Sequence, residues 1–172
     1  RAQLAQADST VVGAETFNAL FTMHGTTMVF MVIMPAGAAA FNYVIPLMIG
    51  AKMAHPEKMC MNFMGDAAFG MSGMDLETAN RIGAPITTVL LNNGTMGGYN
   101  RSMPTAMEVF DAGNMYGDYA GIAEDLGGVG IKITDPSEIA GGLTKARQIN
   151  FDEGKSVLLD VKTQQELTFS EY

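Results

Sequence analysis

From Thr16 to Ala51 the sequence contains no Asp, Glu, Lys or Arg, and this divides the chain into two parts of different character. Residues 52–172 carry nine basic and sixteen acidic residues, a density typical of a soluble domain. We therefore predict an apolar segment at 1–51 and a separate domain at 52–172. The formal net charge of the 172-residue chain is −8 and no basic run occurs, which argues against nucleic acid as a partner.

The apolar segment is long enough to cross a membrane. Thr26–Gly50 exceeds the roughly 20 apolar residues that a membrane span requires. Pro35 and Pro46 interrupt it, because a proline inside a helix removes a hydrogen bond and kinks the helix. The pattern predicts a membrane-type helix over about 16–34, a break, and a second apolar stretch. The basic flank and small-residue cleavage site of a secretory signal are both missing.

His24 is an ionisable side chain within the uncharged stretch Thr16–Ala51. An ionisable residue inside such a run is a candidate for function, and a neutral imidazole can ligate a haem iron. A histidine that only hydrogen-bonds a neighbour is the alternative.

The surrounding sequence favours the haem hypothesis through a resemblance. Residues 15–51 resemble subunit I of the haem-copper (cytochrome c) oxidases, and the resemblance is carried by Phe21–Phe30, Met34-Pro35, Asn42-Tyr43 and Ile45–Ala51. In that family the histidine of this motif is an axial ligand of the low-spin haem, and His24 occupies its place. The chain has no counterpart of the family's second axial histidine or of its copper-binding histidines.

Residues 58–161 alternate between strand-like and helix-like patterns. Apolar and β-branched runs predict strands at 58–64, 86–91, 129–133 and 156–161. Helices are predicted at 72–82, 104–110, 116–126 and 135–149, the last with Asp135 as its cap and Pro136 in its first turn. This alternation implies βαβ crossovers, so we predict an α/β fold with a parallel sheet and flanking helices.

Two polar loops follow neighbouring predicted strands at the edge where parallel sheets bind ligands. Asp66 follows the first strand, and Asn93 follows the second. Mg²⁺ prefers oxygen ligands and often keeps phosphate oxygens in its shell. The Asp66 carboxylate, the Asn93 amide oxygen and the Thr95 carbonyl could supply three such ligands. Small residues after Asp66 would let backbone N–H groups approach phosphate. Each loop by itself is also an ordinary turn, with Asp66 as a helix cap.

The two loops together are more specific than either loop alone. Gly65-Asp66-Ala67 is followed by twenty-four residues and then Asn92-Asn93, which resembles the thiamine-diphosphate motif. Gly65–Ala79 and Thr88–Gly94 resemble the acetolactate-synthase-like group, which contains decarboxylases and carboligases of 2-oxo acids. The resemblance covers residues 52–172.

The resemblance implies specific roles in binding thiamine diphosphate and magnesium. Asp66 and Asn93 would bind the metal through their side chains, and Thr95 through its carbonyl. Gly65, Ala67 and Ala68 would contact the diphosphate, although many members of the family have glycine in place of Ala67.

In this family the cofactor lies between two domains, usually of two subunits, and a glutamate of the pyrimidine-binding domain activates it. The chain contains no such domain, and it lacks the first strand and helix of the family's diphosphate domain. We therefore expect a fragment that is inactive alone. Its partners would be the pyrimidine-binding domain of a complete subunit in a homo-oligomer and a small 2-oxo acid substrate. We expect a cytoplasmic location for 52–172, and membrane association through 16–51.

We interpret the chain as a chimera of two unrelated pieces joined near Gly50–Lys52, where both families have a similar short string. Recombination or a sequence-assembly error would produce such a junction. A genuine membrane-tethered domain is the rival hypothesis. The alternative function is that of a fragment of haem-copper oxidase subunit I that binds haem through His24.

Overall fold

The computed structural model describes residues 43–96 and 103–165. The chain divides into two units, residues 1–40 and 41–172, and all of the described residues belong to the second. The helix predicted over 16–34 and the predicted haem ligand His24 lie outside the described residues. Within the described ranges, no helix is both long enough and apolar enough to span a bilayer.

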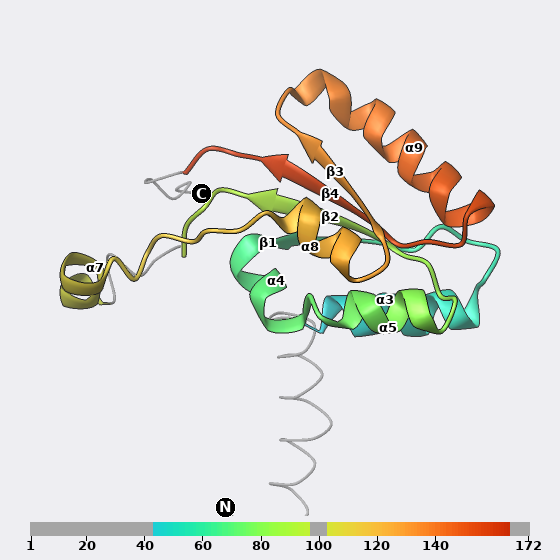
Figure 1. Ribbon diagram of the computed structural model, residues 1–172, viewed down its shortest axis with the longest axis horizontal. Helices are drawn as coiled ribbons and strands as arrows, with labels where there is room; N and C mark the ends of the chain where they lie inside the picture. Colours follow the sequence, from blue (N-terminus) through green and yellow to red (C-terminus); the bar gives the residue numbers. More distant parts are fainter. Residues whose placement is uncertain (1–42, 97–102, 166–172) are drawn as a thin grey trace, which may run out of the picture. The chain divides into compact units, whose positions relative to one another are not determined.

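A four-stranded parallel sheet forms the centre of the second unit (Figure 1). Its strands are β1 (Met61–Gly65), β2 (Thr87–Asn92), β3 (Val129–Ile133) and β4 (Val157–Lys162), in the order β1-β2-β4-β3. In register, Gly65 lies opposite Leu91, and Asn92 lies opposite Lys162. The carboxyl ends of β1, β2 and β4 therefore meet at one edge. The predicted parallel α/β sheet is confirmed.

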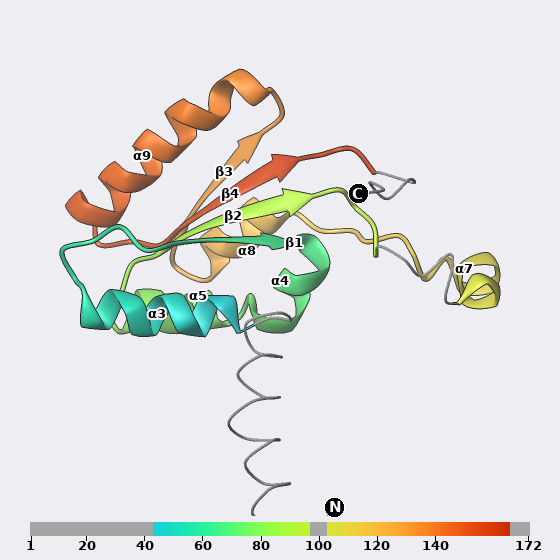
Figure 2. The same cartoon turned by 180° about the vertical axis from the view of Figure 1, so that it is seen from behind.

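Helices flank both faces of this sheet. They are α3 (Val44–Ala54), α4 (Asp66–Ser72), α5 (Asp75–Arg81), α7 (Pro104–Phe110), α8 (Tyr119–Asp125), the 3₁₀ helix η3 (Pro136–Glu138) and α9 (Ile139–Asp152). Helices α3, α4, α5 and α8 lie on one face, and α9 lies on the other (Figures 1 and 2). None of the residues of α7 is buried.

Side chains alternate between the two faces along each strand, as the pleat requires. Leu90 and Leu158 point into the cluster beneath α3, α4, α5 and α8, where they meet Ile45 and Leu76. Val89, Val157, Leu159 and Val161 point the other way, toward Ala146 and Ile149 of α9. Burying each large aliphatic side chain contributes about 1.5–3 kcal/mol, so both helical layers are held mainly by this apolar contact.

Helix α3 crosses the boundary that we predicted at Lys52. Ile45 and Ile49, from the apolar side of that boundary, are buried in the same cluster as residues of the sheet. Pro46 is accommodated because it lies in the first turn of α3, where no intrahelical N–H bond is lost. Residues 44–51 therefore form one helix with residues 52–54.

Two helix starts differ from the sequence-based expectation. The polar loop predicted after the first strand is instead the start of a helix: Asp66 begins α4, with Gly65 at the cap position, since the alanines that follow favour a helix. Helix α8 begins at Tyr119 rather than Tyr116, because the side chain of Asp118 accepts a hydrogen bond from the Gly121 N–H and caps it. The predicted cap Asp135 is confirmed: its carboxylate accepts from the Ser137 N–H at 2.8 Å.

Candidate functional site

Asp66 joins the two polar loops at the carboxyl edge of the sheet. It follows β1 directly and is only 2% exposed. Its Oδ2 accepts a hydrogen bond from the backbone N–H of Gly94 at 2.8 Å, and its Oδ1 accepts one from Ala67 at 2.9 Å. The loops after β1 and β2, 28 positions apart in sequence, are thus connected through one carboxylate.

The buried charge of Asp66 has no cationic protein partner in the part of the chain that the structure describes. The ion pairs found there join exposed side chains elsewhere. Buried carboxylates are normally paired or coordinate a metal. Among the same residues no group of three or more His, Cys, Asp or Glu side chains is placed to hold a metal ion. A cation at Asp66 would therefore also need ligands of other types, such as amide and carbonyl oxygens.

The turn after β2 carries such oxygens. The Oδ1 of Asn93 accepts from the backbone N–H of Thr95 at 3.0 Å, which folds the turn back on itself. Gly94 has a φ of +68°, in the left-handed region that favours glycine. Its carbonyl accepts from the Met115 N–H at 2.9 Å.

Thr95 closes this turn against the segment that follows α7. It is buried and forms an isolated antiparallel bridge with Asn114. The two backbone hydrogen bonds of this bridge are made by the neighbours Gly94 and Met96, so the bridge does not occupy the Thr95 carbonyl. The Thr95 hydroxyl accepts from the Gln165 side chain at 3.2 Å. The geometry thus leaves the predicted carbonyl ligand available.

Gly65 has room beside it for a ligand. Its backbone is extended (φ −80°, ψ 164°), and a Cβ built there would meet no atom within 4 Å. Neither conformation nor packing within the described chain requires glycine at this position. The surroundings of Ala67 and Ala68 favour the predicted diphosphate contacts less than those of Gly65 do. The Ala67 N–H already donates to Asp66, and Ala68 packs against the core.

Asp160 and Asn92 form a buried polar pair beneath the turn, which the sequence analysis missed. The Nδ2 of Asn92 donates to Oδ1 of Asp160 at 2.8 Å, and both residues are buried. Asp160 lies in β4 between apolar neighbours. A carboxylate inside an otherwise apolar strand was the signal that could have identified it.

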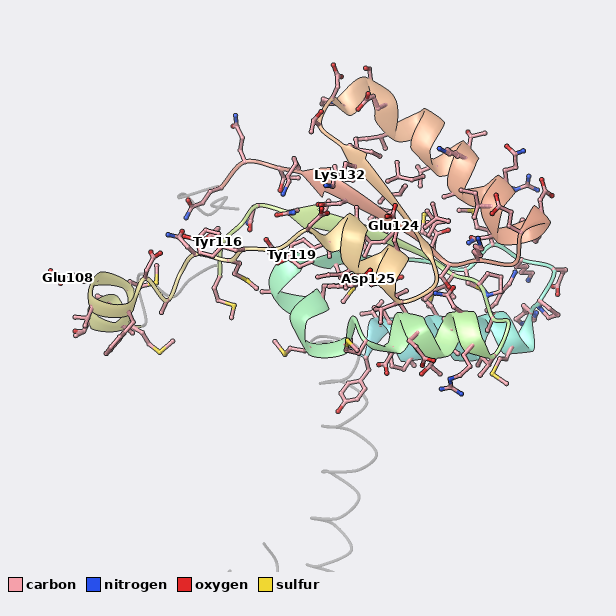
Figure 3. The ribbon with its side chains drawn as sticks, in the orientation of Figure 1. Glu108, Tyr116, Tyr119, Glu124, Asp125 and Lys132 are labelled. Atoms are coloured by element: carbon pink, nitrogen blue, oxygen red, sulfur yellow. The ribbon has the colours of Figure 1, made fainter. Side chains whose placement is uncertain are left out.

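Tyr119 is buried and lies in the first turn of α8 (Figure 3). Its ring makes an edge-to-face contact with Phe69 of α4, with centroids 5.6 Å apart. Burial raises the pKa of the Tyr119 hydroxyl above its ordinary value, and the nearby charges of Asp66 and Asp160 raise it further. The phenol of Tyr119 thus lies within electrostatic range of both carboxylates.

The raised pKa of Tyr119 predicts a loss of stability in alkali. A phenol whose pKa is higher in the folded protein than in the unfolded chain stabilises fully below the ordinary value of 10.0, and this contribution falls as the pH rises beyond it. We expect the wild type to lose unfolding free energy relative to Tyr119→Phe above that pH, measured by urea unfolding at each pH. The exposed Tyr116 provides the control, and Tyr116→Phe should follow the wild type. Parallel curves for all three proteins would contradict the assignment.

Comparison with known proteins identifies a family for most of the chain. Residues 14–161 match the family described as thiamine pyrophosphate enzyme, C-terminal TPP binding domain. A sulfoacetaldehyde acetyltransferase of Alcaligenes xylosoxydans xylosoxydans is 31% identical over 73% of this chain and 21% of its own length. The acetolactate synthase large subunit of Haemophilus influenzae is 32% identical over 73% of this chain and 22% of its own length. The chain thus spans about a fifth of the length of these relatives.

A solved structure supports the fold. The thiamine diphosphate-dependent 4-hydroxybenzoylformate decarboxylase of Rhodococcus jostii RHA1 aligns with a TM-score of 0.59 and 23% identity, over 74% of this chain and 24% of that chain. At this identity the likeness concerns the fold alone.

A shorter match concerns the oxidase resemblance. Cytochrome c oxidase subunit 1 of a Synechocystis species is 47% identical over 64 residues, which is 37% of this chain and 12% of the relative. The thiamine pyrophosphate family match begins at residue 14 and so includes residues of the oxidase-like segment. The junction near Gly50–Lys52 and haem ligation by His24 stay predictions.

Proposed function

Because the chain belongs to the family of C-terminal TPP-binding domains of thiamine pyrophosphate enzymes, we propose that its carboxyl-edge site binds the diphosphate of thiamine pyrophosphate through Mg²⁺. The observation that carries this proposal is the 2.8 Å hydrogen bond from Gly94 to Asp66, which brings the two predicted ligand loops together. Asp66 and Asn93 would hold the metal through side-chain oxygens, and Thr95 through its carbonyl.

The chemistry of these donors fits a hard cation. Both oxygens of Asp66 accept backbone N–H groups, and this fixes the carboxylate while each oxygen keeps a further lone pair. A bound cation would offset the cost of burying this charge without a protein cation. One carboxylate, one amide and one carbonyl leave the remaining octahedral positions to phosphate oxygens and water, as Mg²⁺ prefers.

Open space beside Gly65 supports the placement of the diphosphate. A ligand can approach the backbone there, since nothing within 4 Å would meet a Cβ. A backbone this accessible suits phosphate oxygens, which are often bound by main-chain N–H groups. We therefore propose that the diphosphate lies over Gly65, between Asp66 and the turn at Asn93.

We further propose that the chain is part of an acetolactate-synthase-like decarboxylase or carboligase of 2-oxo acids. Thiamine pyrophosphate, when bound, supplies the electron sink for such reactions. The residues of this chain bind and orient its diphosphate end. In this proposal a pyrimidine-binding domain of a complete subunit, in a homo-oligomer, completes the site.

Metal removal tests the proposed function. We expect the 172-residue chain to bind thiamine pyrophosphate in isothermal titration calorimetry with Mg²⁺ present. Binding should be at least about tenfold weaker after chelation, because the metal joins the Asp66 carboxylate to the diphosphate and these anions otherwise repel each other. Adding Mn²⁺ to the chelated protein should restore it. Thiamine without the diphosphate is the matched control and should not respond to metal. Equal affinity with and without metal would refute the proposal.

A further inference from the structure

We propose that Asp160 is a positioning residue for the ligand Asn93 and acts through the side chain of Asn92. This inference rests on the proposed function, and it adds a residue that lies 67 positions beyond Asn93 and outside both loops of the motif. Asp160 would not touch the metal or the diphosphate. Its role is to hold the first residue of the turn that carries Asn93.

Two contacts, one from β4 and one from the residue that follows it, hold Asn92. Its side-chain amide donates to Oδ1 of Asp160 at 2.8 Å, and its carbonyl accepts from the backbone N–H of Thr163 at 2.9 Å. Asp160 lies opposite Leu90 in register and is 1% exposed. Because Asp160 is part of a central strand, it offers Asn92 a fixed acceptor rather than a mobile one.

The other end of the turn is held from the first residue of α4. The Gly94 N–H donates to Asp66, so Asn93 lies between two anchored residues. Its own side chain is folded onto the Thr95 N–H. Without the contact to Asp160, Asn92 is held from β4 through its backbone alone. The peptide before Asn93 is then less constrained, and the direction of the Asn93 side chain shifts with it. A ligand displaced by even a fraction of an ångström fits an octahedral metal shell poorly.

The cost of burying Asp160 supports a role beyond packing. The neighbouring strand residues Leu159 and Val161 are apolar, and an apolar side chain at 160 would avoid the desolvation of a carboxylate. Among residues 43–96 and 103–165, no Lys, Arg or His makes an ion pair with Asp160.

Four variants of the 172-residue chain test the inference by calorimetry with thiamine pyrophosphate and Mg²⁺. Asp160→Ala should weaken binding by about tenfold or more, the effect typical of losing a partner that orients a metal ligand. Asp160→Asn should bind within about threefold of the wild type, because an amide oxygen still accepts from Asn92. Asn92→Ala should match Asp160→Ala. The double variant Asn92→Ala/Asp160→Ala should be no weaker than either single variant, since both remove one interaction.

A second measurement uses the protein without ligand. The Gly94 amide proton, which is held by Asp66, should exchange faster in Asp160→Ala than in the wild type when followed by NMR. In Asp160→Asn it should exchange at the wild-type rate. If Asp160→Ala fails to fold, the comparison of Asn92→Ala with Asp160→Asn decides, because only the first removes the hydrogen bond.

Several outcomes would overturn the inference. They are wild-type affinity in Asp160→Ala, additive losses in the double variant, or equal losses in Asp160→Ala and Asp160→Asn. Failure of the proposed function is distinguishable, because the wild type itself would then show no magnesium-dependent binding. In that case, unchanged Gly94 exchange in Asp160→Ala would separately exclude the positioning role.

Discussion

Replacing Asp66 with alanine is expected to abolish magnesium-dependent binding of thiamine pyrophosphate. The change removes a proposed metal ligand together with the acceptor of the Gly94 and Ala67 N–H groups. Losing both the ligand and the connection between the loops should weaken binding by at least about 100-fold, or about 2.7 kcal/mol. Calorimetric titration with thiamine pyrophosphate at constant Mg²⁺ measures this directly.

Two matched variants separate charge from shape at this position. Asp66→Asn has the same size but removes the negative charge and keeps one of the two oxygen acceptors, so it should lose most of the metal dependence while still accepting one backbone N–H. Asp152→Ala removes the same charge from an exposed position in α9 and should bind as the wild type does. If Asp66→Ala bound thiamine pyrophosphate as tightly as Asp152→Ala does, this result would show that Asp66 does not hold the metal.

Replacing Gly130 with alanine is expected to cost about 3 kcal/mol of unfolding free energy, the upper range for overpacking a well-packed site. Strand β3 passes directly beneath the start of α8 at this residue. A Cβ on Gly130 would overlap the carbonyl oxygen of Ala120 and lie 2.6 Å from the Ala120 Cα. These atoms are helix backbone, so they can yield only if α8 moves. Urea unfolding should show the loss, and the melting temperature should fall by on the order of 10 °C.

Gly141 provides the matched control for this substitution. It lies in α9, is exposed, and has no atom within 4 Å of a Cβ built on it. Gly141→Ala should stabilise the protein by about 0.5–1 kcal/mol, because alanine loses less conformational freedom in a helix than glycine does. Equal effects of the two substitutions would show that α8 and β3 do not approach each other as closely as described.

Local pattern was sufficient to predict most of the α/β fold. β3 and α7 have the predicted bounds. The signal for β3 is a short apolar run between turns, and the signal for α7 is a proline at the helix start. Both signals depend only on residues that are close in the sequence. The positions of Asp66 and Asn93 could also be predicted, because parallel strands place their carboxyl ends at one edge. Turn-forming residues were a less reliable guide to secondary structure. Residues 65–70 contain glycines typical of turns, yet they begin a helix that packs Phe69 into the core.

The sequence by itself determined the strand pattern, the cap at Asp135, the bounds of α7 and the spacing of the two polar loops, because each depends on neighbours in the chain. Only the tertiary structure decided that Asp160 accepts a hydrogen bond from Asn92, that burial and two carboxylates raise the pKa of Tyr119, and that Gly130 admits no side chain. Those relations join residues from different strands and helices. The physical reason is that burial and close approach depend on which elements pack together, and periodicity along one element carries no information about its partner.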